Sequence, residues 1–119
     1  MRVAINGFGR IGKLVLRAFL EKNLKSIEIV AINDTGSLDS NYHLMKFDST
    51  HGKLPFKISK TKIGLKVKNK NIAFISEKDP KKLPWKKLKV DVVLECSGFF
   101  ASKEKSYGHI QAGAKKVII

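Results

Sequence analysis

The chain has 119 residues and a formal net charge of +14, with 24 lysines and arginines against 10 aspartates and glutamates. This length corresponds to one domain, which can bury roughly 60–70% of the surface that its unfolded chain exposes. No run of about 18 apolar residues occurs, which excludes a membrane-spanning helix. The single cysteine, Cys96, cannot form an internal disulfide, and the N-terminus has no apolar leader segment. We therefore expect a cytoplasmic protein without a secretory signal.

The positive charge comes almost entirely from lysine, because Arg2, Arg10 and Arg17 are the only arginines. Such a charge attracts nucleic acids and anionic membranes without specificity. Arginine, the usual reader of base edges, is scarce, and aromatic residues are not interleaved with the lysines as a stacking platform requires. A lysine bias across the host's proteins is the simpler explanation. A nonenzymatic basic module that binds nucleic acid stays open as an alternative.

The first twenty residues predict a strand, a glycine-rich turn and a helix. An apolar run at 3–5 is followed by Gly7, Gly9 and Gly12 at the spacing G-x-G-x-x-G, and apolar residues then recur at helical spacing over 13–20. Gly7 permits a tight turn, Gly9 lets a phosphate approach the backbone, and Gly12 lets the helix pack close to the strand. The N–H groups and dipole at the start of the helix attract an anion. This segment therefore predicts a site for the pyrophosphate of a dinucleotide.

A second apolar segment, residues 27–32, predicts a buried strand that ends at Asn33 and Asp34. In dinucleotide-binding folds, an acidic residue at the end of this strand accepts hydrogen bonds from the adenosine ribose. Asp34 has this place, slightly later than the usual spacing of about 20 residues. The alternative is a glycine-rich turn followed by a solvated aspartate. The order of strand, turn and helix favours the dinucleotide.

The next segment is polar at first and predicts a short helix over 41–47, with Ser40 as its N-cap. Residues 48–52 predict a turn, because aspartate, serine and threonine can bond their own backbone and glycine supplies positive φ. His51 lies in this turn without a catalytic partner nearby in the sequence, so we interpret it as structural.

Alternating apolar and basic residues over 62–68, a turn at 69–70 and a return over 71–75 predict an antiparallel hairpin. One face of this hairpin is expected on the core and the lysines on the other. Trp85, beside Pro84, is interpreted as a core side chain beneath the following loop.

Residues 90–94 form an apolar run, broken only by Asp91 near its start, that predicts a central parallel strand. In a doubly wound sheet, ligands bind beyond the carboxyl ends of the strands, so Ser97, Gly98 and Phe100 are expected beside the adenosine and ribose of a cofactor. Cys96 is interpreted as a small buried residue, because no histidine adjoins it in the sequence to act as a base.

The last segment predicts a helix over 102–112, with Ser102 as N-cap and Gly113 as C-cap. His109 is expected to pack or hydrogen-bond within the fold. Residues 116–119 predict another buried strand. The alternation of strands and helices predicts an α/β fold, namely a doubly wound, mostly parallel Rossmann-type sheet with helices on both faces and an antiparallel hairpin insertion.

The segment NGFGRIG, from Asn6 to Gly12, resembles the opening of phosphorylating glyceraldehyde-3-phosphate dehydrogenases. Further blocks that resemble this family occur in family order along the whole chain: AIND at 31–34, FDSTHG at 47–52, LPW at 83–85, ECSG at 95–98 and AGAKKVII at 112–119. Family enzymes usually have a hydroxyl residue at the position of Cys96, which is a mild departure.

The motif and the resemblance together imply the following cofactor-binding residues: Asn6, Gly7, Phe8, Gly9, Arg10, Ile11, Gly12, Asn33, Asp34, Thr35, Lys78, Ser97, Gly98 and Phe100. Lys78 is assigned to the adenine end by the resemblance, and a solvated loop lysine is the alternative. Asp34 favours NAD, because its carboxylate accepts from the ribose and repels a 2′-phosphate. Thr35 and Gly36 resemble the plastid and cyanobacterial branch that accepts both cofactors, so we expect NADP to be tolerated.

The resemblance implies an enzyme that oxidises glyceraldehyde 3-phosphate with NAD(P) and inorganic phosphate to 1,3-bisphosphoglycerate, and a homotetramer at full length. The family's nucleophilic cysteine, base histidine and substrate-binding arginine match no segment of this chain. We therefore expect residues 1–119 to be an incomplete dinucleotide-binding domain that is inactive without a catalytic domain. Erythrose-4-phosphate dehydrogenase, of the same family, shares most of these blocks and is the alternative activity.

Overall fold

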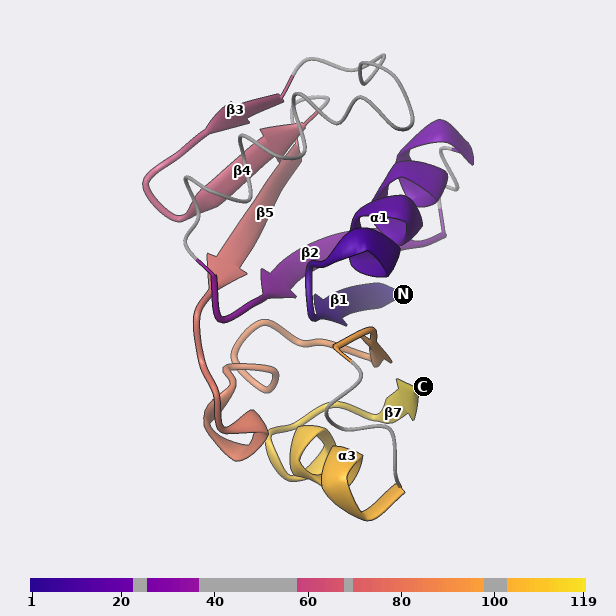
Figure 1. Ribbon diagram of the computed structural model, residues 1–119, viewed down its shortest axis with the longest axis vertical. Coiled ribbons are helices and arrows are strands. Elements are labelled where there is room, and N and C mark those ends of the chain that lie inside the picture. Colours follow the sequence, from indigo (N-terminus) through magenta and orange to yellow (C-terminus); the bar gives the residue numbers. More distant parts are fainter. Residues whose placement is uncertain (23–25, 37–57, 68–69, 98–102) are drawn as a thin grey trace.

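The computed structural model describes residues 1–22, 26–36, 58–67, 70–97 and 103–119. These residues form one sheet with the strand order β3-β4-β5-β2-β1-β6-β7, accompanied by helices (Figure 1). In chain order the elements are β1 (Arg2–Asn6), α1 (Arg10–Lys22), β2 (Glu28–Asn33), β3 (Ile58–Lys60), β4 (Gly64–Val67), β5 (Lys70–Ile75), the short 3-10 helix η1 (Pro80–Lys82), β6 (Val92–Glu95), α3 (Lys103–Gln111) and β7 (Lys116–Ile118).

The five strands β5, β2, β1, β6 and β7 run parallel to one another. From β1 the chain builds β2 and β5 on one side and then returns to build β6 and β7 on the other. This reversal at β1 is the switch point of a doubly wound sheet, where ligands bind beyond the carboxyl ends of the strands. The predicted α/β fold with a mostly parallel sheet is confirmed.

The predicted hairpin is formed by β4 and β5, which pair antiparallel, and β3 adds a third antiparallel strand beside β4. Leu65 and Val67 are buried while Lys66 between them is exposed, so β4 alternates as expected. β5 also pairs in parallel with β2. The hairpin is therefore a continuation of the main sheet and shares one strand with its parallel part.

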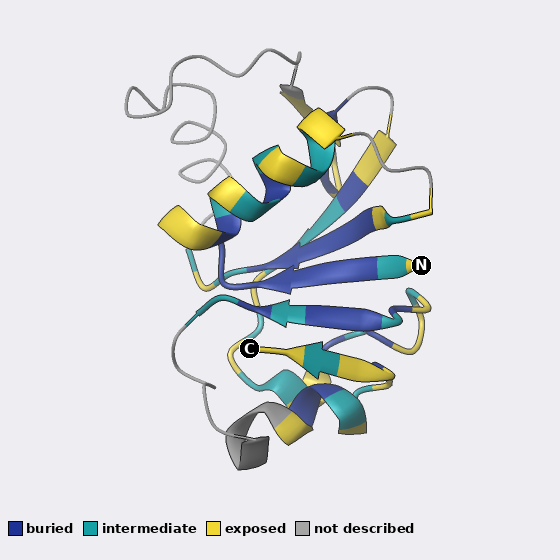
Figure 2. Cartoon of the chain, turned by 90° about the vertical axis from the view of Figure 1, so that its right-hand side faces the viewer, coloured by how far each residue is buried: buried dark blue, intermediate teal, exposed yellow. Residues whose placement is uncertain are grey.

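A hydrophobic core lies on each face of the sheet, because successive side chains of a strand point to opposite sides. Val3 and Ile5 of β1 pack with Leu16 of α1 in one core. Ala4, which lies between them, belongs to the other core together with Trp85, which is fully buried as predicted. Figure 2 shows the buried residues concentrated in the central strands and the exposed ones on the outer side of α1.

The helix α3 ends in a glycine C-cap, as predicted. Gly113 has a φ of 118°, which a residue with a Cβ rarely adopts. The N–H of Ala114 donates to the carbonyl of His109, and the N–H of Gly113 donates to that of Ile110, both at 3.0 Å. This pair of bonds is the Schellman motif, which satisfies carbonyls that the end of a helix leaves without partners.

The prediction of a buried strand at 116–119 is wrong in its burial. β7 forms, but Lys116 is exposed and Ile118 and Ile119 are 47% and 61% exposed. The reason is position, since β7 is the last strand of the described sheet and pairs only with β6 there. The predicted helix at 41–47, the turn at 48–52 with His51, and the N-cap Ser102 lie outside the described residues. None of the helices that the structure describes is long and apolar enough to cross a membrane.

Candidate functional site

A cavity of about 410 Å³ opens beyond the carboxyl ends of β1, β2 and β6, at the switch point of the sheet. It is lined by eight of the predicted site residues: Asn6, Gly7, Gly9, Asn33, Asp34, Thr35, Lys78 and Ser97. Glu77 and Cys96 also line it, although the sequence did not single them out as binding residues. Of the other predicted residues, Phe8, Arg10, Ile11 and Gly12 adjoin the cavity in the chain without lining it. Gly98 and Phe100 lie outside the described residues.

The glycine turn connects β1 to α1, and each glycine in it has a different environment. Gly7 has a φ of 93°, and a Cβ added there would lie 2.5 Å from the Cα of Ser97. A Cβ on Gly12 would lie 2.3 Å from the carbonyl oxygen of Gly7, whereas one on Gly9 would meet no heavy atom within 4 Å. The first and third glycines are therefore required by the fold. The second leaves exposed backbone beside open space.

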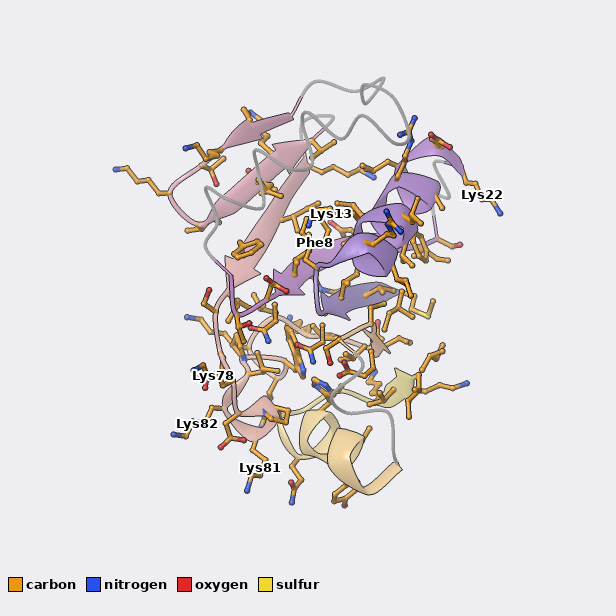
Figure 3. The ribbon with its side chains drawn as sticks, viewed as in Figure 1. Phe8, Lys13, Lys22, Lys78, Lys81 and Lys82 are labelled. Carbon is orange, nitrogen blue, oxygen red and sulfur yellow. The ribbon has the colours of Figure 1, made fainter. Side chains whose placement is uncertain are left out.

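Phe8, which the sequence assigned to the cofactor, has a fully buried side chain in the core beneath α1. Lys13, on the first turns of α1, donates a hydrogen bond from Nζ to the carbonyl of Phe8, and its Nζ lies 4.6 Å from the centre of the Phe8 ring (Figure 3). This cation–π contact and hydrogen bond hold the turn against the helix. Arg10 and Ile11 are exposed at the start of α1, where the first N–H groups of a helix have no intrahelical acceptor.

Asp34 fixes the position of the glycine turn relative to the end of β2. Its Oδ1 accepts from the N–H of Phe8 and its Oδ2 from the N–H of Gly36, both at 2.9 Å. The N–H of Gly7 also donates to the carbonyl of Asn33, at 2.7 Å. Each carboxylate oxygen has two lone pairs, so these bonds leave Asp34 chemically able to accept from a ribose hydroxyl. Its positioning of the turn was not anticipated from the sequence.

Beneath the cavity lies a chain of buried polar side chains that sequence reasoning did not connect. The carboxylate of Glu95 is 2.7 Å from both Nδ2 of Asn6 and Nε2 of His109. Its other oxygen accepts from the N–H of Ser97 at 3.0 Å and from the hydroxyl of Ser97 at 2.5 Å. On the far side, Trp85 donates from Nε1 to Nδ1 of His109 at 3.0 Å. The expectation that His109 hydrogen-bonds within the fold is confirmed.

Glu95 is only 6% exposed, yet the structure favours its charged form. Burial alone would raise the pKa of Glu95, but the hydrogen bonds from His109, Ser97 and Asn6 outweigh it and lower the pKa below its ordinary value. The available signal was a glutamate directly after an apolar strand and a histidine in a helix that packs on the sheet. A single sequence does not show that two such positions meet.

Cys96 is half-buried and lines the cavity, whereas the sequence suggested a buried residue. Burial raises the pKa of the Cys96 thiol, and the neighbouring charge of Glu95 raises it further. A thiolate is the nucleophilic form of cysteine, so this environment disfavours a catalytic role.

Lys78 is exposed at one side of the cavity, on the segment between β5 and η1. Lys81 and Lys82 of η1 project from the same side of the molecule (Figure 3). The structure therefore leaves both interpretations of Lys78 open, since it is solvated and also borders the cavity.

The arrangement fits a dinucleotide. The start of α1 offers N–H groups to a pyrophosphate, the open space at Gly9 lets the ligand approach the backbone, and Asp34 offers acceptors to a ribose. The cavity volume of about 410 Å³ lies within the range of small-molecule sites, roughly 300–1,000 Å³.

Comparison with known proteins gives the same picture. Residues 1–103 match the family described as glyceraldehyde 3-phosphate dehydrogenase, NAD binding domain. The chain is 53% identical over 118 residues to the glyceraldehyde-3-phosphate dehydrogenase of Thermotoga maritima, covering 99% of this chain and 35% of the relative. It is 51% identical over 119 residues to the enzyme of the same name from Chlamydia pneumoniae, covering 100% of this chain and 35% of that relative.

The chain thus spans about a third of the length of these curated relatives, namely 35% of each. The match covers the strand, glycine turn and helix of the amino-terminal half together with the strand β6 that completes the cavity. The chain belongs to the glyceraldehyde-3-phosphate dehydrogenase family and corresponds to its NAD-binding domain.

Proposed function

We propose that this chain binds NAD as the cofactor-binding part of an enzyme that oxidises glyceraldehyde 3-phosphate with inorganic phosphate to 1,3-bisphosphoglycerate. The observation that carries the proposal is the cavity at the switch point, where the glycine turn meets Asn33 and Asp34. The substrate rests on the relatives, each of which is named a glyceraldehyde-3-phosphate dehydrogenase. No observation on the described residues favours erythrose 4-phosphate or nucleic acid over this assignment.

NAD, when bound, would supply the acceptor for a hydride. The residues of this chain would bind and orient it. The backbone around Gly9 and the start of α1 would hold the pyrophosphate, because N–H groups and the helix dipole favour an anion there. Asp34 would accept from ribose hydroxyls, and Ser97, Asn6 and Asn33 would form the adjoining wall.

We propose further that NAD is preferred and NADP tolerated. The charge of Asp34 opposes a 2′-phosphate, while the hydroxyl of the exposed Thr35 can donate to a phosphate oxygen. The preference should be modest, roughly 1–3 kcal/mol, which is the contribution of one hydrogen bond to a charged group. Titration of both cofactors tests this. Asp34→Ala should reduce the difference between the affinities for NAD and NADP, whereas Thr35→Leu should increase it. Equal affinities in the parent would remove this region from the choice of cofactor.

The central test compares the parent with Gly9→Val in a calorimetric titration with NAD. A Cβ added at Gly9 meets no heavy atom within 4 Å outside its chain neighbours, so the variant should keep its melting temperature and lose affinity by more than about tenfold. Ala18→Val, on the exposed side of α1, adds two methyl groups away from the cavity and should leave the affinity unchanged. If Gly9→Val binds NAD as well as the parent does, the pyrophosphate does not lie at this turn.

The remaining expectations also belong to this proposal. We propose that the enzyme works in the cytoplasm, that it assembles as a homotetramer at full length, and that this chain alone does not turn over substrate. Phosphate-dependent production of NADH by the chain alone would contradict the last point and direct attention back to Cys96.

A further inference from the structure

Two residues of the buried polar chain, Glu95 and His109, do not line the cavity and have no role in the function proposed above. Glu95 is 6% exposed and His109 is fully buried, so neither can contact a ligand directly. Burying a carboxylate and an imidazole is unfavourable unless each is fully hydrogen-bonded. Because Glu95 and His109 lie directly beneath Asn6 and Ser97, we asked whether they act on these two residues of the cavity wall.

The donors and acceptors along this chain of residues follow from chemistry. The indole N–H of Trp85 can only donate, so Nδ1 of His109, 3.0 Å away, must be unprotonated. The proton of the neutral ring then lies on Nε2, which donates to Glu95 at 2.7 Å. Because the pKa of Glu95 is lowered, its carboxylate is ionised at neutral pH and can only accept.

This carboxylate orients two residues in the cavity wall, and for Asn6 it acts together with Asn33. Asn6 must direct its Nδ2 toward Glu95, at 2.7 Å, so its Oδ1 is left to accept from Nδ2 of Asn33, also at 2.7 Å. Asn33 in turn accepts at Oδ1 from the N–H of Glu77 at 2.9 Å. Ser97 donates its hydroxyl proton to Glu95, so toward any ligand its oxygen can act only as an acceptor.

We propose that Glu95 and His109 are positioning residues for the dinucleotide. Glu95 sets the amide orientation of Asn6 and the hydroxyl orientation of Ser97, and His109 holds Glu95 in place. The inference rests on the proposed function, because it concerns the same cavity. Its consequence is that the wall of the cavity is fixed before the ligand arrives, which lowers the entropic cost of binding.

The first test measures the affinity for NAD by calorimetry, at a temperature where every variant is folded. Glu95→Gln keeps the shape of the side chain but replaces one acceptor by a donor, and it should weaken binding about tenfold. His109→Phe removes the donor to Glu95 and should also weaken binding. His109→Gln supplies an amide N–H near the position of Nε2 and should restore much of the affinity that His109→Phe loses.

A matched control separates positioning from stability. Val67→Ala removes volume from a fully buried residue of β4, away from the cavity, and should lower the melting temperature without changing the affinity. If Glu95→Gln binds NAD like the parent while being less stable, the pair is structural only and the inference is overturned. If the parent itself does not bind NAD, the proposed function fails and this inference fails with it.

A second measurement does not depend on NAD. In protein labelled with ¹⁵N-histidine, the ring nitrogens of His109, identified by their loss in His109→Gln, should report a neutral ring protonated at Nε2. In Glu95→Gln the ring should keep this tautomer, because Trp85 still donates to Nδ1, but the Nε2 signal should shift because its acceptor is no longer a carboxylate. A ring protonated at Nδ1 in the parent would contradict the assigned donors and acceptors of the buried hydrogen bonds and would overturn the inference.

Discussion

The two faces of the sheet are built differently. On the face covered by α1, the core consists of aliphatic and phenyl side chains such as Ile5, Phe8 and Leu16. On the other face, Trp85 packs against small aliphatic residues and also donates to His109, which begins the polar chain that leads to the cavity. One face thus requires only apolar volume, whereas the other also requires hydrogen bonds of fixed direction. We therefore expect substitutions on the two faces to have different effects on stability and on the affinity for NAD.

The largest effect should come from the apolar face. Leu16→Ala removes a fully buried side chain of α1 and should lower the free energy of unfolding by about 2–5 kcal/mol. Leu16 makes no hydrogen bond through its side chain, so the folded variant should bind NAD with the affinity of the parent. Urea denaturation and a calorimetric titration at low temperature check both statements. A loss of affinity in the folded variant would show that the apolar face also determines the geometry of the site.

A smaller loss of stability is expected from Trp85→Phe on the other face. The change keeps an aromatic ring but removes the indole N–H that donates to Nδ1 of His109, which should cost about 1–3 kcal/mol. Unlike Leu16→Ala, it should also alter the ¹⁵N signals of the His109 ring, because the tautomer is no longer fixed from that side. Unchanged ring signals would mean that the two faces differ in composition only.

The difference between the apolar face and the hydrogen-bonded face also explains which features could be predicted from the sequence. The apolar runs at 3–5 and 90–94 and the alternation at 62–68 predicted strands, because hydrophobic period follows secondary structure. The cavity wall was anticipated at Asp34 and Ser97, since ligands of doubly wound sheets bind where strands end. The exposure of β7 was missed, because hydrophobic period does not show which strands pair beside a given strand within the described residues.

The polar chain could not have been predicted in the same way. Glu95 and His109 are 14 residues apart, and His109 and Asn6 are 103 apart, so only the folded sheet brings them together. Periodicity assigns a residue to a face but does not pair one polar residue with another across that face. Likewise, Phe8 was assigned to the cofactor by its place in a motif, while its side chain is buried in the core.

The smallest effect concerns how stability changes with pH in acid, and it should differ between the two faces of the sheet. The pKa of Glu95 is lowered in the folded protein, so the unfolded chain takes up the proton more readily. The stabilisation from Glu95 is therefore fully present above the unfolded pKa of about 4.3 and is lost as the pH falls through the folded pKa. Glu95→Gln should be less stable than the parent at neutral pH, and its stability should fall less steeply below about pH 4.5.

Asp91 contributes to the same pH range and must be separated from Glu95. Its pKa is lowered by the backbone N–H of Arg2 and then by Lys115, both remote from the cavity, so it titrates in the parent and in Glu95→Gln alike. Asp91→Asn therefore gives the matched comparison, in which the acid loss due to Glu95 remains. Leu16→Ala, on the apolar face, should keep the full acid dependence of the parent at a lower overall stability. Urea denaturation between pH 3 and 7 measures the free energy of unfolding of the parent and the three variants. If Glu95→Gln and the parent lose stability in parallel, the buried carboxylate is not ionised in the folded protein, and the hydrogen-bond directions assigned to Asn6 and Ser97 no longer follow.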